Sequence, residues 1–136
     1  MKTKPLTFLL ALTFLFLFSG SSVVFGDDFQ DGFDAYDRKD YKTAHRLWLS
    51  LAQQGDSFAQ YFLGMMYDKG QGVPQDYKEA VKWYRLSAEQ GDAIAQCNLR
   101  GMYNKGKGVP QDYKEAVKWW KLAAGQHDEQ AQFILE

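Results

Sequence analysis

Histidine, cysteine and carboxylate side chains could supply acid, base or nucleophilic chemistry, but this sequence arranges few of them in a suitable pattern. The two histidines are His45, which aligns with Val81 and Val117 in an internal repeat, and His127, which falls in a predicted turn. Most carboxylates stand at helix starts or on polar faces, where nothing raises their pKa for acid or base work. We therefore expect neither enzymatic activity nor a cofactor.

A series of aspartates at every third position could be interpreted as a calcium site: Asp28, Asp31, Asp34, Asp37 and Asp40. This spacing does not match the D-x-D-x-D-G ligand loop. A solvated helix face is expected instead, favoured near the helix N-terminus by the helix dipole. Gly70-Gln71-Gly72 lacks the lysine and the preceding strand of a phosphate-binding loop, so it is predicted to be a turn. No metal site is expected.

Cys97 is the only cysteine, so no internal disulfide is available to this chain. The aligned residues in the neighbouring repeats are Tyr61 and Phe133, which predicts a buried free thiol. A disulfide-linked dimer is the alternative.

The tryptophans could form a platform for stacking sugars: Trp48, Trp83, Trp119 and Trp120. Three of them fall at recurring positions of predicted second helices, where an aromatic residue normally fills the space between layers. Core packing is therefore predicted, and a polysaccharide-binding surface is the alternative.

The elements that position these residues come from a repeat. The segment GVPQDYKEAVKW occurs unchanged at residues 72–83 and 108–119, and residues 57–92 match residues 93–128 at 23 of 36 positions. A more diverged copy precedes them, because Tyr41, Ala44 and Trp48 fall 36 residues before Tyr77, Ala80 and Tyr84. Repeats of this length stack into solenoids. An all-α fold of antiparallel helix pairs follows.

Helical spacing of apolar residues defines the expected helices within each unit. Asp56, Asp76, Asp92, Asp112 and Asp128 are predicted N-caps, and Glu79 and Glu115 are predicted to complete capping boxes. Gly70 and Gly106 are predicted to end helices in the left-handed conformation. We expect helices near 28–38, 41–54, 57–69, 77–90, 93–105, 113–125 and 128–135.

One position breaks the symmetry between the two best-matched units. Gly64 permits close approach to Ala80, but the aligned residue is Arg100, and the glycine moves to Gly101. We predict a wider or shifted helix pair at residues 93–125, with Arg100 reaching solvent along its aliphatic stem.

The first 26 residues have the layout of a secretory signal peptide. Lys2 and Lys4 precede an apolar run at residues 6–18, which is shorter than a bilayer span, and cleavage is expected after Gly26. An uncleaved anchor is the alternative. We expect a secreted protein in the periplasm or outside the cell, with no stable membrane span. Removal of residues 1–26 takes away Lys2 and Lys4, which leaves 14 basic and 17 acidic residues in the expected mature chain. The resulting net charge of about −3 gives no electrostatic footprint for nucleic acid.

The repeated pattern A-Q-x-x-L-G-x-M-Y-x-K-G-x-G-V-P-Q-D-Y resembles the Sel-one-like repeat, a relative of the tetratricopeptide repeat. The resemblance is strong over residues 57–92 and 93–128. It is weaker over residues 28–56, where the G-x-G-V-P-Q insertion is missing and the unit is more like a tetratricopeptide repeat. It implies a right-handed α/α solenoid over residues 27–136. A short helix at 128–135 would close the array or mediate weak self-association.

The resemblance implies that first helices line a concave groove for a protein or peptide partner. Transferred groove positions give five candidate contacts: Tyr61, Met65, Asp68, Asn98 and Asn104. Phe58, Phe62 and Ile94 could be contacts or core. The predicted function is an exported adaptor, in envelope signalling or host contact. A glycan-binding module is the alternative. A cysteine-rich branch of the family has been linked to β-lactam binding or hydrolysis, but this chain lacks its cysteine pairs.

Overall fold

The computed structural model describes residues 24–125, and within that range every regular element is an α-helix. The helices are α2 (Val24–Asp37), α3 (Tyr41–Gln53), α4 (Ser57–Lys69), α5 (Tyr77–Glu89), α6 (Ala93–Lys105) and α7 (Tyr113–Gly125). The expected all-α fold is confirmed. The predicted helix at 128–135, His127 and residues 1–23 lie outside the described residues.

Most helix boundaries agree with the prediction to within one residue. The exception is α2, which begins at Val24 rather than near residue 28. The helix therefore runs through Gly26, the residue after which cleavage is expected. Processing there would remove the first three residues of α2 and leave Asp27 at the new N-terminus.

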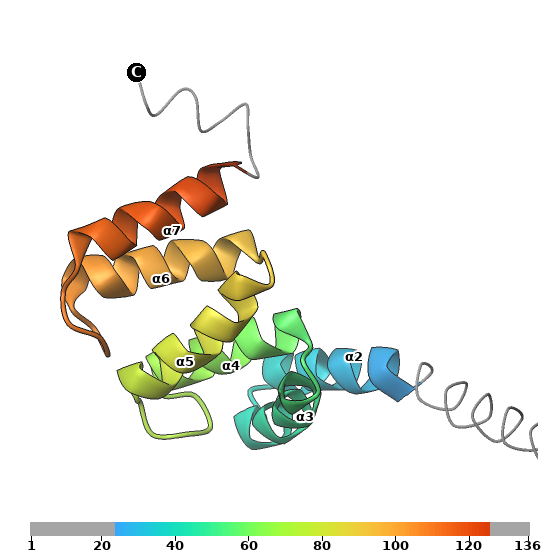
Figure 1. The fold of residues 1–136 in the computed structure, drawn as a ribbon. Helices are drawn as coiled ribbons and strands as arrows, with labels where there is room; N and C mark the ends of the chain where they lie inside the picture. The colour runs from blue at the N-terminus through green and yellow to red at the C-terminus, as the bar shows by residue number, and fades with distance from the viewer. Residues whose placement is uncertain (1–23, 126–136) are drawn as a thin grey trace, which may run out of the picture.

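The helices pack in consecutive pairs, and each pair packs on the next. Contacts within pairs join α2 to α3, α4 to α5 and α6 to α7, and contacts between pairs join α3 to α4 and α5 to α6. Figure 1 shows the resulting stack, which runs from blue α2 to red α7. One apolar cluster centres on Trp48, Leu51 and Leu63, and a second on Tyr84, Ala88 and Leu99. The core is thus shared between neighbouring units, as expected for a solenoid.

Aspartate residues cap the starts of the helices at the positions predicted from the sequence. Asp56 and Asp92 accept hydrogen bonds from the backbone N–H groups of Ala59 and Ala95, at 2.8 and 2.7 Å. Asp76 accepts from the N–H groups of Lys78 and Glu79, and Asp112 accepts in the same way from residues 114 and 115. These bonds satisfy donors that the first helical turn leaves unpaired.

The prediction of complete capping boxes was wrong. The backbone N–H of Asp76 donates to the Tyr67 carbonyl, not to the Glu79 side chain. That carboxylate lies 3.5 Å from Lys82 instead. The second long loop repeats the arrangement, because the Asp112 N–H donates to the Tyr103 carbonyl. The insertion before each second helix bends back on its own first helix and takes over the bond that Glu was expected to accept.

These insertion loops also connect neighbouring units. The first helices α4 and α6 end at glycines in the left-handed region, Gly70 and Gly106. The next glycine along, Gly72 or Gly108, lies against the backbone at the start of the preceding unit's second helix, around Tyr41 and Tyr77 respectively. A Cβ at Gly108 would lie 2.2 Å from the Tyr77 carbonyl oxygen. The loops therefore contribute to the contact between units.

The two long-loop units differ where Gly64 is replaced by Arg100. The Tyr84 ring packs directly over Gly64, and a Cβ there would lie 2.5 Å from the ring. In the following unit Arg100 is exposed, as expected, and it lines a hollow of about 330 Å³ with Trp120, the residue aligned to Tyr84. A contact that is filled between α4 and α5 is therefore open between α6 and α7. The predicted shift of the helix axes stays a prediction.

Candidate partner-binding site

A polar hollow of about 170 Å³ lies between α4 and α6. Its lining combines an acid, an amide, a thiol and two lysines with a glycine and a methionine. These seven residues are Asp68, Cys97, Asn98, Gly101, Met102, Lys105 and Lys107. Asp68 and Asn98 belong to the set predicted from the groove pattern. They come from neighbouring units, so the stacking of the repeats brings them together.

A buried tyrosine joins these two residues. Tyr84 is 1 % exposed, and its hydroxyl donates to Asp68 Oδ2 at 3.4 Å, a long hydrogen bond. The Asn98 side chain lies near this hydroxyl, and its interaction with the hydroxyl lowers the pKa of Tyr84. Burial raises the pKa of Tyr84, and the neighbouring Asp68 carboxylate raises it further. The hydroxyl therefore keeps its proton and can serve as the donor to the Asp68 carboxylate.

The rim of the hollow was largely missed by the sequence analysis. Lys105 and Lys107 are exposed there, and Lys107 Nζ lies 4.9 Å from the centre of the Tyr77 ring. Lys107 stands where the preceding unit has Gln71, which accepts a hydrogen bond from the Tyr36 hydroxyl. This exchange of an amide for a cation was a visible signal. It changes the charge of one loop in an otherwise matching pair.

Cys97 is exposed, so the prediction of a buried thiol was wrong. The aligned Tyr61 is half-buried because its ring packs against Phe62 and Tyr84, with ring centres 5.1 and 6.0 Å apart. In the next unit Asn98 replaces Phe62, which removes an aromatic neighbour from the position beside Cys97. Alignment between repeats predicts the burial of a side chain only where the residues that pack around it are also repeated.

The remaining predicted contacts are distributed elsewhere. Tyr61 and Met65 are half-buried and pack against the second apolar cluster. Asn104 is exposed and lines the separate hollow beside Arg100 and Trp120. The structure therefore brings Asp68 and Asn98 together and leaves Asn104 apart. A partner contact at any of the five stays a prediction.

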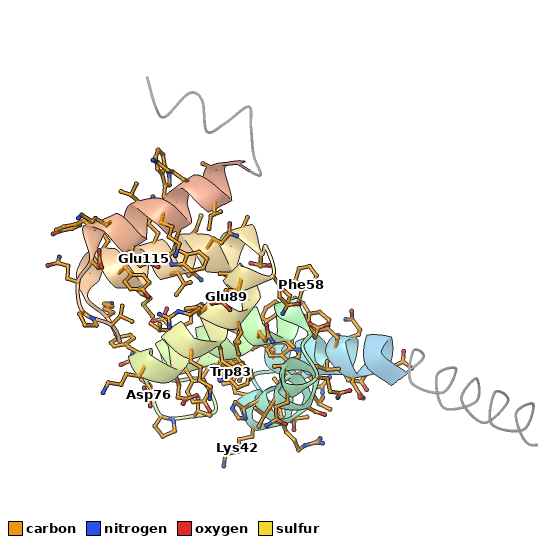
Figure 2. All side chains as sticks on the ribbon, in the orientation of Figure 1. Lys42, Phe58, Asp76, Trp83, Glu89 and Glu115 are labelled. Carbon is orange, nitrogen blue, oxygen red and sulfur yellow. The ribbon has the colours of Figure 1, made fainter. Side chains whose placement is uncertain are left out.

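The sequence did not decide whether three apolar residues belong to the core or to the surface, and the structure divides them between the two. The Phe62 ring stacks on Trp48 with ring centres 4.5 Å apart, so it belongs to the core. Phe58 and Ile94 are 62 % and 59 % exposed, at aligned positions in the first turns of α4 and α6. Figure 2 labels Phe58 at this end of α4. These two side chains form part of the surface.

Most of the tryptophans are core residues. Trp48, Trp83 and Trp119 are at most 7 % exposed, which confirms the packing prediction for them. Trp120 is half-buried beside the hollow between α6 and α7. A sugar-stacking platform built from the first three is excluded by their burial, because a stacked ring needs an open aromatic face.

The described residues offer little for catalysis or metal binding. Within residues 24–125, no three histidine, cysteine or acidic side chains gather in a metal-binding arrangement. His45 is half-buried, with Nε2 3.4 Å from the Tyr67 hydroxyl, and burial lowers the pKa of its imidazole. Among the described helices, none combines the length and apolar character needed to cross a bilayer.

The structure consists of repeated helix pairs with glycine-bounded loops and a shared core. A comparison with known sequence families identifies this kind of repeat. The Sel1 repeat pattern matches residues 29–56, 57–92 and 93–128. The chain belongs to the Sel1 repeat family. The match includes the first unit, although the Sel1 insertion is missing there.

Solved structures agree with this assignment. The protein c5321, described as a protective antigen present in uropathogenic Escherichia coli strains and displaying an SLR fold, is 40 % identical, with a TM-score of 0.73 over 75 % of this chain. A Sel1 repeat protein from Oxalobacter formigenes is 38 % identical, with a TM-score of 0.71 over 77 % of this chain. The present chain spans only 23 % and 43 % of those two proteins.

A third structure, cysteine-rich protein B of Helicobacter pylori, shares the fold at 21 % identity and a TM-score of 0.63, over 85 % of this chain and 98 % of its own. No curated protein matches the sequence significantly. This Sel1 repeat protein is thus a helical repeat scaffold, a kind of protein that is typically not catalytic.

Proposed function

We propose that this Sel1 repeat protein is a non-catalytic adaptor that binds an extended segment of a partner protein in the polar hollow between α4 and α6. The observation that carries the proposal is that Asp68 and Asn98 both line the hollow beside the Tyr84 hydroxyl, which donates to Asp68 and lies near the Asn98 side chain. An extended peptide presents unpaired N–H and C=O groups. The Asp68 carboxylate can accept from the former, and the Asn98 amide can donate to the latter.

The buried Tyr84 hydroxyl makes these two polar groups suitable for binding. It restrains the Asp68 side chain from inside the protein and lies near Asn98, so less conformational entropy is lost when a partner docks. The two residues come from adjacent units, which suits a segment that crosses from one unit to the next. Gly101, where an added Cβ would meet nothing within 4 Å, leaves space for the segment's backbone.

The charges at the hollow favour a partner segment with an acidic side chain. Lys105 and Lys107 stand on the α6 side, and Asp68 stands on the α4 side. A partner carboxylate is attracted toward the lysines and repelled by Asp68. The two kinds of charge therefore favour an acidic segment and also fix the direction in which it lies across the hollow. The lysines are exposed, so binding is expected to weaken as salt is raised.

The test is capture of a partner from an envelope extract by the immobilised full chain. Asn98→Ala removes a group at the hollow and is expected to reduce recovery of the captured protein roughly tenfold or more, as loss of a central contact does. Asn104→Ala is the matched control, because this amide lines a different hollow. A denaturation curve for each variant separates lost binding from lost folding.

Three outcomes bear on the proposal. Loss of capture by Asn98→Ala with retention by Asn104→Ala supports it. Loss only by Asn104→Ala would move the site to the hollow between α6 and α7. Equal capture by both variants would place the contact on another surface. Tyr61→Ala with Met65→Ala is a poorer test, because both side chains pack against the core.

The adaptor is further proposed to act after export, in the periplasm or outside the cell. The support is the signal-peptide layout of residues 1–26, with Lys2 and Lys4 before an apolar run. Intact mass measurement on protein from the envelope and the medium is expected to show an N-terminus at Asp27. Recovery of the chain with Met1 in the membrane fraction would instead indicate an uncleaved anchor.

A further inference from the structure

The outer side of α7 combines lysines with exposed aliphatic side chains. The inner side of this helix packs against the rest of the stack, and its residues Ala116, Trp119 and Ala123 are at most 5 % exposed. On the other side, at helical spacing, five residues line a shallow hollow of about 430 Å³ and form the α7 outer strip: Lys114, Val117, Lys118, Lys121 and Leu122. All three lysines are exposed, and the two aliphatic side chains are 47 % and 46 % exposed.

The α7 outer strip carries a local positive charge. Glu115 is the one acidic residue of α7, and its carboxylate lies 3.0 Å from Lys118 Nζ. Within residues 24–125, neither Lys114 nor Lys121 makes an ion pair. At the opposite end of the stack (Figure 1), α2 has five aspartates and no basic residue. Charge is therefore segregated between the two ends, although the sequence as a whole is close to neutral.

The equivalent strip on α5 shows that this side of a second helix stays open. Leu86 aligns with Leu122 and is 39 % exposed. The cations aligned with the lysines of the α7 outer strip are Lys78, Lys82 and Arg85. Although α6 packs on α5, both lysines and Leu86 remain exposed. The outer strip therefore points away from the side on which a following helix packs.

We propose that the α7 outer strip docks this protein on the surface of an anionic lipid membrane, without spanning it. The lysines meet the negatively charged headgroups, and Val117 and Leu122 enter the boundary between headgroups and acyl chains. The stems of the lysines add apolar surface to the contact while their ammonium groups stay hydrated. The strip contains none of the residues assigned to partner binding, so the two proposals are independent.

The aliphatic side chains favour a membrane over a soluble polyanion. The lysines alone would suit either, since both offer negative charge. Val117 and Leu122 gain free energy only where they leave water, and the acyl region of a bilayer provides that environment. A soluble polyanion offers them little apolar surface and would leave them hydrated.

Sedimentation with lipid vesicles tests the docking. Protein isolated from cells is mixed with vesicles of phosphatidylcholine, either alone or with added phosphatidylglycerol, which is anionic. The readout is the excess of binding to the anionic vesicles, because the apolar run at residues 6–18, where it is retained, binds both kinds. This excess is expected to fall as salt is raised, since exposed charges are screened.

Removal of the two unpaired lysines identifies the face that binds. Each cation near an anionic surface strengthens binding about fivefold, so Lys114→Gln with Lys121→Gln is expected to weaken it roughly 25-fold. Arg38→Gln with Lys69→Gln is the matched control, because it removes the same charge from exposed positions outside α7. Thermal unfolding followed by circular dichroism shows that each double variant is folded. No excess binding to anionic vesicles by the wild type, or equal losses in the two double variants, would overturn the proposal.

Substitution of Leu122 separates a membrane from a soluble polyanion. Leu122→Gln keeps every charge and is expected to weaken binding to the anionic vesicles about fivefold, because an aliphatic side chain no longer leaves water. Binding to polyglutamate, measured in parallel, is expected to be the same for this variant and the wild type, and weaker than binding to the vesicles. Vesicle binding that Leu122→Gln leaves unchanged, with equally tight binding to polyglutamate, would overturn the proposal and assign the strip to a soluble polyanion.

Discussion

Tyr84 fills its position because the residue opposite it has no side chain. The ring lies over Gly64, where a Cβ would come within 2.5 Å of it, while its hydroxyl reaches Asp68. Gly101, one residue beyond the aligned position, has no atom within 4 Å of a built Cβ. Two glycines in equivalent helices thus have opposite roles, and the difference is steric.

Substitution of these glycines separates their roles. Gly64→Ala forces the buried Tyr84 ring to move and is expected to lower the free energy of unfolding by about 1–3 kcal/mol, as overpacking does. Gly101→Ala is expected to be neutral or to stabilise by up to about 1 kcal/mol, because alanine is the better helix former. Urea denaturation of both variants measures this. Equal effects would contradict the steric explanation.

His45 is expected to make stability depend on pH. Burial holds the pKa of its imidazole below the ordinary 6.5, so below pH 6.5 the unfolded chain binds more protons than the folded chain. The free energy of unfolding therefore falls as pH drops through 6.5 toward the lowered pKa, and His45 adds no further dependence below that. His45→Val introduces the residue found at positions 81 and 117. It is expected to flatten this part of the pH dependence, as measured by melting temperature between pH 5 and pH 8.

The variant also identifies the source of the effect. Carboxylates contribute at lower pH in both proteins, so only the difference between wild type and His45→Val is assigned to His45. An identical change of melting temperature with pH in the two proteins would show that the imidazole titrates normally in the folded state.

At the scale of helices, the sequence predicted where α3 to α7 begin and end because the signals are local. An aspartate before a helix and a glycine after it act through bonds to the nearest backbone groups. The start of α2 lacked such a signal and was placed four residues too late. The role of Glu79 was also misjudged, because the Asp76 N–H donates instead to the carbonyl of Tyr67, in the last turn of α4 before the insertion loop.

Candidate site residues were predicted less completely, because they are brought together by contacts between residues that are distant in the sequence. Asp68 and Asn98 could be named because they stand at groove positions transferred from the tetratricopeptide pattern, which the sequence resembles. Their connection through Tyr84 depends on packing between units, which no local pattern encodes. Cys97 was misplaced because its burial depends on whether Phe62 or Asn98 stands beside it.

Substitution of Asp76 tests how much the N-cap of α5 contributes to stability. Asp76→Ala removes the acceptor for two backbone N–H groups and is expected to cost about 1 kcal/mol of stability. Glu79→Gln is the matched control, because Glu79 makes no reciprocal bond to the cap and its contact with Lys82 is exposed. A change of less than about 0.5 kcal/mol is expected there. A larger loss for Glu79→Gln than for Asp76→Ala in chemical denaturation would restore the capping-box interpretation.

At the scale of the whole molecule, stability is distributed along the stack. Among residues 24–125, the main contacts between helices join each helix pair to its neighbours, so local changes are expected to affect adjacent units more than distant ones. The insertion loops strengthen these interfaces, because Gly72 lies on the backbone at Tyr41 and Gly108 lies on the backbone at Tyr77. The first unit lacks an insertion of its own and receives the loop of the second.

Gly108→Ala tests whether the loop joins the last two units. The residue has φ of +70°, and its new Cβ would lie 2.2 Å from the Tyr77 carbonyl oxygen. A left-handed alanine costs roughly 1–2 kcal/mol, and displacement of the loop adds to this cost. Gly55→Ala is the control, since it also has a positive φ but meets nothing within 4 Å. Hydrogen exchange is expected to show faster opening of α6 and α7 in Gly108→Ala, with α2 to α4 unchanged. Uniform loss of protection along the stack would mean that the array unfolds as a single cooperative unit.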